Sequence, residues 1–486
     1  MKNKEFAGII FLFTLLRLLA VSFMGLMPQD AYYTYYAENL SWSYFDHPPM
    51  VAYMIRVFIT LFGKSAFSLH FGDFLLTSAT LYLFYLFLRR FLEGEMLRKA
   101  FLLVQTAPFI TILMINTTPD VPLMFFWTLA LLLIFEAVKT KRWYFWLLAG
   151  LASGLAFDSK YTALFLPAGL FCFLFFSKEH RQLLLSWKFV LFAAAFVSAC
   201  FPVIYWNIQH DFISIKYQSA ERASGMNGIM IKPKWIFGYL GTQLAIALPV
   251  FFVTLFISLF ALAKQAWKRE KIESGSLFAA SFSLPMLCCF TAIAFISWVK
   301  MNWIMPVFIS GGLLAVPYFR SASLLRRQTV FSVLLHILLI VEIIWMPIPI
   351  NSDDTWWGWD KLAEEVRELK TTHQDVIVFS DDLYKTSAAL NFYLPDHVYA
   401  GNLIGKFAYQ FGLDDADLSS LEGRNALFIS SEKRVRGNEN IQESLEEYFE
   451  VVTPLDNIIL RDNKNKVRRR FAVFKCDNYA KGLRKH

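Results

Sequence analysis

The chain has 486 residues, of which 56% are hydrophobic and only 18% charged. A soluble globular protein usually has less than half apolar residues and about a quarter charged ones, so this composition excludes a soluble enzyme, a disordered chain and a disulfide-rich secreted domain. The net charge of +8 arises in residues 1–350, which hold 28 Lys and Arg against 16 Asp and Glu, whereas residues 351–486 hold 19 against 23. Basic residues between apolar runs orient membrane helices and do not indicate nucleic-acid binding. The sequence therefore predicts a transmembrane domain, 1–350, followed by a polar domain, 351–486.

Apolar runs fill the first domain, and crossing a hydrocarbon core of about 30 Å takes roughly 20 helical residues. The first run follows MKNKE, but it is too long for a secretory signal and lacks an A-x-A-like exit, so we interpret it as a retained helix. The fold class predicted is a polytopic α-helical membrane protein with about eleven spans. They are 6–27, 70–88, 100–116, 119–138, 143–157, 161–177, 188–206, 236–262, 276–297, 303–319 and 329–350.

The loops between these runs predict the orientation. One set of loops, which includes the N-terminus, holds 19 Lys and Arg, and the other set holds eight although two of its loops are the longest. Loops rich in Lys and Arg stay in the cytoplasm. The N-terminus is therefore expected in the cytoplasm, and an odd number of spans places 351–486 on the opposite face.

Two segments on the outer face are long, 28–69 and 207–235. In the first, a tyrosine-rich stretch, Ala31–Leu40, is expected to form a short helix. A second, mostly apolar helix is expected from Pro48 through Phe62, too short to span the membrane and suited to its interface. The aromatic residues here fit either an interfacial belt or a substrate-binding role, and the sequence leaves both open.

Three carboxylates, Asp30, Asp46 and Asp120, lie at predicted outer membrane boundaries, in PQDAYY, YFDHPP and TTPDVP. A carboxylate beside the apolar slab is costly unless it is paired, hydrated or functional, which makes each a candidate site residue. The alternative for each is a helix cap or a solvated loop acid. Asp120 suits that alternative best, because an acid near a helix start offsets unpaired N–H groups.

Basic residues on the same face complete the set: Lys160, Arg222 and Lys300. A lysine at the membrane boundary commonly extends its ammonium group to water. The alternative is that these groups bind the phosphate of a lipid-linked donor through charge-assisted hydrogen bonds. His47, next to Asp46, is either a metal ligand or a hydrogen-bonding partner of an acid.

The order of these motifs carries a resemblance. Asp30 precedes tyrosine-rich sequence, and YFDHPP (44–49), TPDVPL (118–123) and SKY (159–161) follow in turn. Over about residues 1–350 the chain resembles the bacterial GT-C-type membrane glycosyltransferases of the protein-mannosyltransferase-like superfamily, which includes the lipid A aminoarabinose transferases.

The resemblance implies a GT-C-like fold in the bacterial inner membrane and an inverting transfer of sugar. The donor would be a polyprenyl-phosphate-linked sugar, and the acceptor an envelope molecule (lipid A or LPS, another glycan, or a protein) outside the cytoplasm. Asp30 matches the catalytic acid of the first outer loop, and Asp120 and Lys160 match an acid and a lysine of later loops. Asp46 matches a metal-associated acid, which implies a divalent ion such as Zn²⁺, Mg²⁺ or Mn²⁺. His47 stands where the aminoarabinose transferases have Lys, and Ala31 replaces the second acid of an Asp-Glu pair.

The chemistry of such a transfer agrees with these residues. A hydroxyl acceptor needs a general base, for which Asp30 is the candidate, whereas a phosphate acceptor is already ionised. Lys160 and Arg222 would offset the charge that gathers on the departing lipid phosphate. The sequence contains no P-loop or GxGxxG motif that would indicate a soluble nucleotide donor.

Residues 351–486 are predicted to form a small α/β domain with a partly parallel sheet. The basic run 464–470 is either a hairpin turn or a patch for acidic lipid headgroups. The expected helices are 360–370 and 383–393, and the expected strands are 375–380, 397–400, 426–430 and 469–475.

Two other functions compete with an enzyme. A transporter or flippase of lipid-linked sugars would use charged residues and aromatic grooves too, but usually has repeated halves, and the sequence shows no internal repeat. A non-catalytic assembly subunit would tolerate loss of Asp30. The residues do not identify the sugar or the acceptor.

Overall fold

The computed structural model describes residues 3–221, 231–318, 322–348, 352–436 and 441–480. The chain forms two compact units, each from two segments. The helical unit consists of Met1–Phe23 and His47–Trp345, and the sheet unit of Met24–Asp46 and Met346–His486. The segment that carries Asp30 and Asp46 therefore belongs to the same unit as the C-terminal residues.

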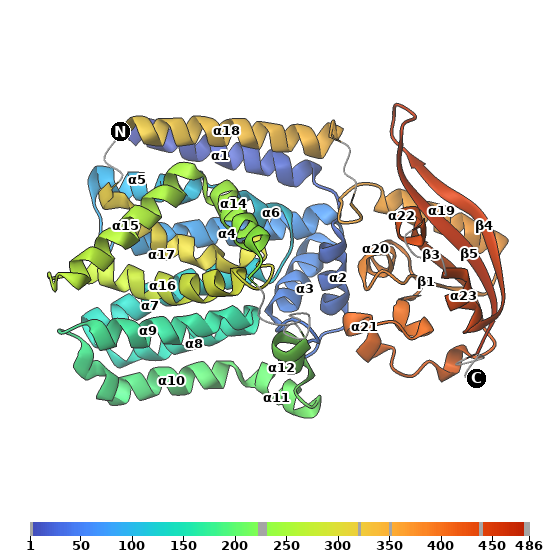
Figure 1. Cartoon of the computed structure of the whole chain (residues 1–486), viewed down its shortest axis with the longest axis horizontal. Coiled ribbons are helices and arrows are strands. Elements are labelled where there is room, and N and C mark those ends of the chain that lie inside the picture. Colours follow the sequence, from blue (N-terminus) through green and yellow to red (C-terminus); the bar gives the residue numbers. More distant parts are fainter. Residues whose placement is uncertain (1–2, 222–230, 319–321, 349–351, 437–440, 481–486) are drawn as a thin grey trace. The chain divides into compact units, whose positions relative to one another are not determined.

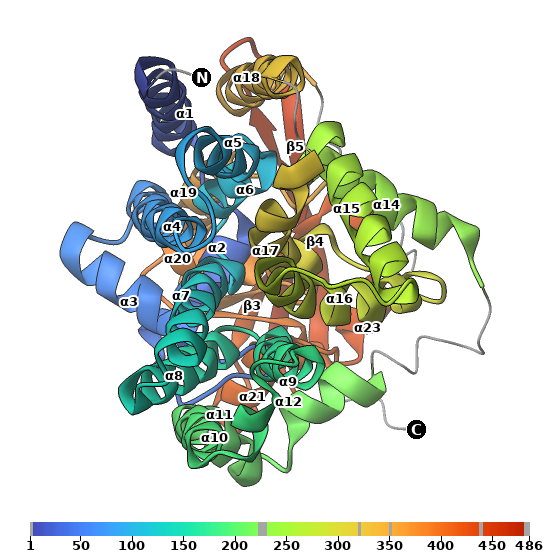
Figure 2. The same ribbon diagram turned by 90° about the vertical axis from the view of Figure 1, so that its left-hand side faces the viewer.

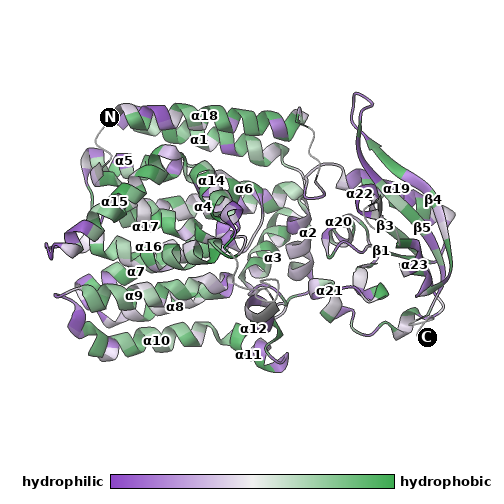
Figure 3. Ribbon diagram, viewed as in Figure 1, coloured by the Kyte–Doolittle hydropathy of each residue, from purple (hydrophilic) through white to green (hydrophobic). Residues whose placement is uncertain are grey.

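Long helices of the helical unit run side by side in Figure 1 and are seen nearly end-on in Figure 2. Figure 3 shows hydrophobic residues along most of their length and hydrophilic residues mainly at the connecting loops. The α-helices of this unit are α1 (Asn3–Phe23), α3 (Met50–Phe62), α4 (Ala66–Leu88), α5 (Gly94–Gln105), α6 (Pro108–Ile115), α7 (Asp120–Thr140), α8 (Trp143–Ser159), α9 (Phe165–Phe176), α10 (Trp187–Ala199), α11 (Phe201–Gln209), α12 (Ile213–Lys216), α14 (Pro233–Ala247), α15 (Pro249–Trp267), α16 (Ser274–Ala294), α17 (Met305–Ala315) and α18 (Ala322–Trp345).

Six helices among the described residues are long and apolar enough to cross a membrane, or up to eight if two bent pairs each form one span. Three shorter apolar helices of 10–17 residues accompany them. The predicted multi-span helical domain is confirmed, and the number eleven stays a prediction. Within the helical unit, the start of α1 and the end of α18 lie at opposite ends of the helices (Figure 1).

The bent pair α5–α6 shows how the unit tolerates a broken helix. The two helices meet at 50°, where Pro108 cannot continue the hydrogen-bond ladder. Carbonyl groups that the break releases accept hydrogen bonds from other helices: Leu103 from Gln328, at 3.2 Å, and Gln105 from Arg17. Freed backbone groups are tolerated at membrane depth only when protein groups bind them in this way.

The predicted span 236–262 is wrong as a single helix. The structure ends α14 at Ala247 and begins α15 at Pro249, and the residue between them, Leu248, has φ +70°. Proline has no N–H to donate and disfavours helical geometry in the residue before it. The apolar run is continuous across this point, so hydropathy does not reveal the break.

The sheet unit contains one five-stranded sheet with the order β2-β1-β3-β5-β4. Strands β2, β1 and β3 are parallel, and β3, β5 and β4 are antiparallel to their neighbours. Its elements are α2 (Pro28–Glu38), α19 (Trp359–Thr372), β1 (Val376–Phe379), α20 (Lys385–Tyr393), β2 (Val398–Tyr399), a 3-10 turn (Gly401–Ile404), α21 (Tyr409–Asp414), a 3-10 turn (Ser419–Leu421), β3 (Asn425–Ser431), α22 (Glu432–Arg436), α23 (Ile441–Glu446), β4 (Phe449–Arg461) and β5 (Val467–Tyr479).

Alternating residues of the strands build a core on each face of the sheet. In β1, Val376 and Val378 face a cluster with α19 and α20, whereas Ile377 and Phe379 face a cluster that includes the Gly401–Ile404 turn and α23. The predicted small α/β domain with covering helices is thereby confirmed.

Most predicted elements of the tail are present, but β4 was missed. It lies at the edge of the sheet and contains Pro454, which a strand tolerates only where a donor is dispensable. The basic run 464–470 covers the turn between β4 and β5 and the start of β5, so the hairpin interpretation is confirmed. Asp462 fixes this turn by accepting hydrogen bonds from the backbone N–H groups of Lys464 and Lys466, both at 2.9 Å.

Candidate active site

Asp120, Lys160 and Asn302 form a polar cluster in the helical unit. Asp120 begins α7 and Lys160 directly follows α8. Only Lys141 and Arg142 connect these two helices, so the start of α7 and the end of α8 lie at the same end of the pair. Lys160 Nζ donates to Asp120 Oδ1 at 2.8 Å, and the side-chain amide of Asn302 donates to Oδ2 at 2.6 Å.

Both charged residues of this cluster are buried. Asp120 is 1% exposed and Lys160 7% exposed, so the lysine does not extend to solvent. The Asp120 side chain is bound by groups of other elements, although its place at the start of α7 still lets it favour the helix dipole. The pair is a charge-assisted hydrogen bond, and the ammonium group has three donors, of which Asp120 takes one.

Of the other two predicted basic residues, the structure describes Lys300 but not Arg222. Lys300 is exposed and immediately precedes the 3-10 turn that contains Asn302, so it lies two positions from the Asp120 cluster along the chain. Arg222 lies outside the described residues.

Asp30 lies in the first turn of α2 and is fully buried. Its Oδ2 accepts a hydrogen bond from the backbone N–H of Met27 at 2.7 Å, as the third helical residue does in a capping box. Thr34 donates to the backbone carbonyl of Asp30 at 2.7 Å. The helix-capping contact that the sequence suggested for Asp120 is thus made by Asp30.

Asp46 accepts hydrogen bonds from two tyrosines of α2. The hydroxyl of Tyr32 lies 3.1 Å from Asp46 Oδ1, and the hydroxyl of Tyr36 donates to the same oxygen. Burial, followed by the nearby charge of Asp46, raises the pKa of both tyrosines, so they stay protonated and donate. Both tyrosines are buried within the protein, so they do not form an exposed interfacial belt, and a substrate-binding role stays a prediction.

The side chains near Asp46 offer few ligands for a metal ion. Among the described residues, no group of three or more His, Cys, Asp and Glu side chains could hold one. Asp46 and His47 supply two ligands, and one Asp46 oxygen already binds the two tyrosine hydroxyls. The described residues therefore do not fit a metal held by protein ligands alone.

Sequence reasoning missed three polar groups near the predicted site residues. Asn302 had no signal beyond its closeness to Lys300. Asp158, two residues before Lys160, is 2% exposed, and its Oδ1 has no hydrogen-bond partner among the described residues. Asp73 is fully buried in α4, where Thr117 donates to it at 2.5 Å. An acid inside an apolar run is a signal that could have identified Asp73 and Asp158.

Comparison with known proteins adds a partial family match and a fold. Residues 46–206 match the model of a family described as dolichyl-phosphate-mannose-protein mannosyltransferase. This range includes Asp46, His47, Asp120 and Lys160. The lipid A galacturonosyltransferase RgtD of Rhizobium johnstonii is 25% identical over 309 residues. That match covers 63% of this chain and 63% of the relative, so the chain matches less than two thirds of the relative's length.

Solved structures share the whole architecture. ArnT from Cupriavidus metallidurans in the apo state aligns with a TM-score of 0.66 at 14% identity and covers 96% of this chain and 98% of its own. ArnT bound to undecaprenyl phosphate aligns at 0.63, with 12% identity, over 97% and 98% of the two chains. The chain therefore has the fold of these membrane proteins. The oligosaccharyltransferase AglB from Archaeoglobus fulgidus, solved with an inhibitory peptide and a dolichol-phosphate, aligns at 0.55 and 11% identity over 96% of this chain and 74% of its own. The GT-C-like fold and the multi-pass membrane character predicted from the sequence are confirmed.

Proposed function

We propose that this protein is an inverting glycosyltransferase that moves a sugar from a polyprenyl-phosphate carrier to lipid A or a similar envelope acceptor. The observation that carries the proposal is the buried Asp120–Lys160–Asn302 cluster. It holds a lysine ammonium group in place, and this group has donors left that can bind a phosphate. Two comparisons support it. The relative RgtD is a lipid A galacturonosyltransferase, and solved structures of ArnT and AglB contain undecaprenyl phosphate and dolichol-phosphate.

In the proposed reaction an acceptor oxygen attacks the anomeric carbon while the bond from that carbon to the phosphate oxygen breaks. The polyprenyl phosphate leaves with the electron pair, and one displacement inverts the anomeric centre. If the acceptor is a hydroxyl, Asp30 takes its proton as general base. If the acceptor is a phosphate, no proton is removed, and Asp30 orients the donor.

The basic residues act on the leaving group. Lys160 keeps donors beyond the one given to Asp120, and the negative charge of Asp120 holds its ammonium in a fixed position. Arg222 and Lys300 are proposed to contact the same phosphate. Fixed cations that meet developing negative charge usually supply the largest catalytic contribution of such a site.

The metal remains a separate proposal, and no step above depends on it. EDTA treatment of the purified protein, followed by Zn²⁺, Mg²⁺ or Mn²⁺, tests it directly. Activity that is lost and then restored by one ion supports a metal at Asp46 and His47, whereas full activity in a metal-free sample rejects it.

We also propose that the protein lies in the bacterial inner membrane with its N-terminus in the cytoplasm and residues 351–486 outside. The basic loops support this orientation. The start of α1 and the end of α18 also lie at opposite ends of the helices, which agrees with it (Figure 1). Reporter fusions after Lys264 and after Ile350 should locate to opposite compartments, and location on the same side would contradict the orientation.

The decisive experiment measures transfer directly. Purified protein in nanodiscs is mixed with synthetic undecaprenyl-phosphate-linked sugars and lipid A, and products are identified by mass spectrometry. We expect glycosylated lipid A from at least one donor and none with Lys160→Met. Lipid A of a deletion strain should lack the same sugar. Movement of intact lipid-linked sugar across the membrane without product would support a flippase.

A further inference from the structure

The parallel half of the sheet has a topological switch point at β1. The chain passes from β1 through α20 to β2 on one side, and β3 pairs with the other side of β1. Open α/β sheets bind their ligands at such a point, in the crevice beyond the carboxyl ends of the strands. What fills this place therefore indicates what the sheet unit does.

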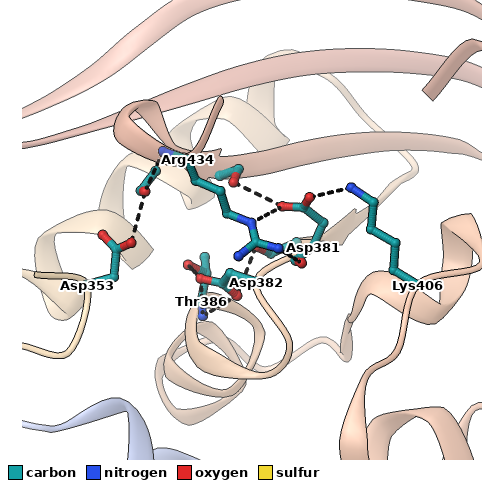
Figure 4. A network of polar contacts seen from close by, with 9 residues as sticks. Asp353, Asp381, Asp382, Thr386, Lys406 and Arg434 are labelled. Atoms are coloured by element: carbon teal, nitrogen blue, oxygen red, sulfur yellow. Dashed lines mark hydrogen bonds and ion pairs between the residues drawn. The ribbon is translucent and has the colours of Figure 1, made fainter. Parts of the chain in front are cut away.

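A network of the chain's own polar side chains occupies this switch point (Figure 4). Asp381, which follows β1, pairs with Lys406 at 2.7 Å and with Arg434, which follows β3, at 3.2 Å. Asp382 accepts hydrogen bonds from the backbone N–H and the hydroxyl of Thr386 at the start of α20. An anion at this helix start would have to displace a carboxylate that is already bound there.

The surface beside this crevice carries α2 instead. The ring of Tyr32 stacks on that of Tyr384, which follows β1, with ring centroids 4.4 Å apart. The ring of Tyr35 stacks on Phe411 of α21 at the same distance. The loops after two parallel strands thus bind a segment of the same chain, where related sheets bind a ligand.

Two residues of α21, Gln410 and Asp414, bind both ends of the segment from Tyr32 to Phe45. Gln410 donates its backbone N–H to the Tyr32 hydroxyl at 3.2 Å, and its side-chain oxygen accepts the N–H of Phe45 at 2.8 Å. The Gln410 amide also donates to Asp414 at 2.8 Å, and Asp414 accepts the hydroxyl of Tyr35 at 2.9 Å. Burial raises the pKa of Asp414.

We propose that the sheet unit positions Asp30: Gln410 and Asp414 fix the tyrosine-rich helix α2, and through it the carboxylate that sugar transfer requires. Asp30 lies on this helix, two residues before Tyr32 and five before Tyr35. Gln410 and Asp414 are positioning residues and do not touch the substrate. The inference rests on the proposed function in one respect, the role of Asp30.

The test compares Gln410→Ala with Gln442→Ala in full-length protein in nanodiscs, with the undecaprenyl-phosphate-linked sugar that the wild type uses. Gln442 makes the same contact to an acid four residues later, Glu446, at 3.0 Å, but on the exposed face of α23. We expect Gln410→Ala to lower kcat about tenfold with KM for the donor within about twofold, because misplaced catalytic groups slow the chemical step more than they weaken binding. Gln442→Ala should match the wild type. Amide hydrogen exchange in 31–39 should be faster only in Gln410→Ala.

A second variant excludes misfolding as the cause. Tyr35→Phe keeps the stacking on Phe411 and removes the hydrogen bond to Asp414. This variant should therefore fold normally and have a kcat about threefold lower than the wild type. Asp414→Asn, which keeps an oxygen acceptor for Tyr35, should stay closer to the wild type than Asp414→Leu.

A double-mutant cycle with Asp30→Asn identifies the route of the effect. If Gln410 acts through Asp30, then Asp30→Asn with Gln410→Ala is no slower than Asp30→Asn alone. Independent, multiplying losses would overturn the positioning role, and so would a Gln410→Ala variant with wild-type kcat. If Asp30→Asn itself keeps full turnover, the proposed function fails at that residue, whereas the exchange measurement on α2 still reports the docking.

Discussion

The two groups of candidate acids are held in opposite ways. Asp120 is bound by Lys160 and Asn302, which are 40 and 182 residues away along the chain. Asp30 is bound by the backbone of Met27, three residues earlier. Removing the carboxylate of Asp120 therefore leaves a buried cation without its counter-charge, whereas replacing Asp30 with asparagine keeps an oxygen that can accept the N–H of Met27. Stability and activity should separate cleanly at Asp30 and fall together at Asp120.

The largest effect is expected for Asp120→Asn. It should lower stability by about 3 kcal/mol, because breaking a buried ion pair leaves a charge in an apolar site, and it should also abolish transfer. Thermal unfolding in nanodiscs and product formation measure the two effects. Adding Lys160→Met should restore stability but not transfer, and a double variant as unstable as Asp120→Asn would show that the pair is not the cause.

Asp30→Asn should reduce kcat about 100-fold, within the usual range for loss of a general base, while stability changes by less than about 1 kcal/mol. Asparagine keeps an oxygen that can accept the N–H of Met27, so the helix start is preserved. Single-turnover kinetics with the lipid-linked donor measure the loss. Unchanged turnover would remove Asp30 from the catalytic residues.

Asp381 in the sheet unit offers an intermediate case. Its side chain is 2% exposed, but its partners Lys406 and Arg434 are 32% and 40% exposed. Water can therefore solvate the cations that remain, and Asp381→Ala should lower stability by about 1–2 kcal/mol, less than the change at Asp120. If Asp381→Ala and Asp120→Asn lowered stability equally, burial of the remaining cation would not determine the loss of stability.

The smallest effect is expected at Asp462, in the exposed β4–β5 turn. Hydrogen bonds, first from the backbone of Lys466, lower the pKa of this carboxyl. A carboxyl with a lowered folded-state pKa stabilises the protein above its unfolded pKa, and this contribution is lost as pH falls through the folded value. Asp462→Ala should thus unfold slightly earlier than wild type at neutral pH, and the difference should vanish in acid. A difference that persists below both pKa values would refute the linkage.

The sequence predicted features that depend on neighbouring residues better than features that depend on residues far apart along the chain. Apolar runs, the helix of 28–38 and the strand at 376–379 depend on local patterns, and the structure confirms them. The break at Leu248 is also local, but an uninterrupted apolar run concealed it. Motif order identified Asp120 and Lys160 individually, yet their pairing depends on how α7 and α8 pack.

The docking of α2 shows the limit of sequence reasoning most clearly. Tyr32 and Tyr35 were visible as part of a tyrosine cluster, but their partners in α21 lie in a region for which the sequence predicted no helix or strand. Gln410 and Asp414 are ordinary polar residues in an exposed-looking segment. No pattern in either stretch indicates that one binds the other.

That distance along the chain also sets an order of assembly. Tyr35 and its partner Asp414 are separated by 379 positions. At synthesis rates of about 5–20 residues per second, Tyr35 leaves the ribosome roughly 20–75 seconds before Asp414 does. The apolar helices can insert during this interval, but α2 gains its docking surface only after α21 has been synthesised. A chain that stops before α21 would therefore contain every candidate catalytic residue and still lack the contacts that order the helix carrying Asp30, so the synthesis of α21 sets the earliest time at which that helix can dock.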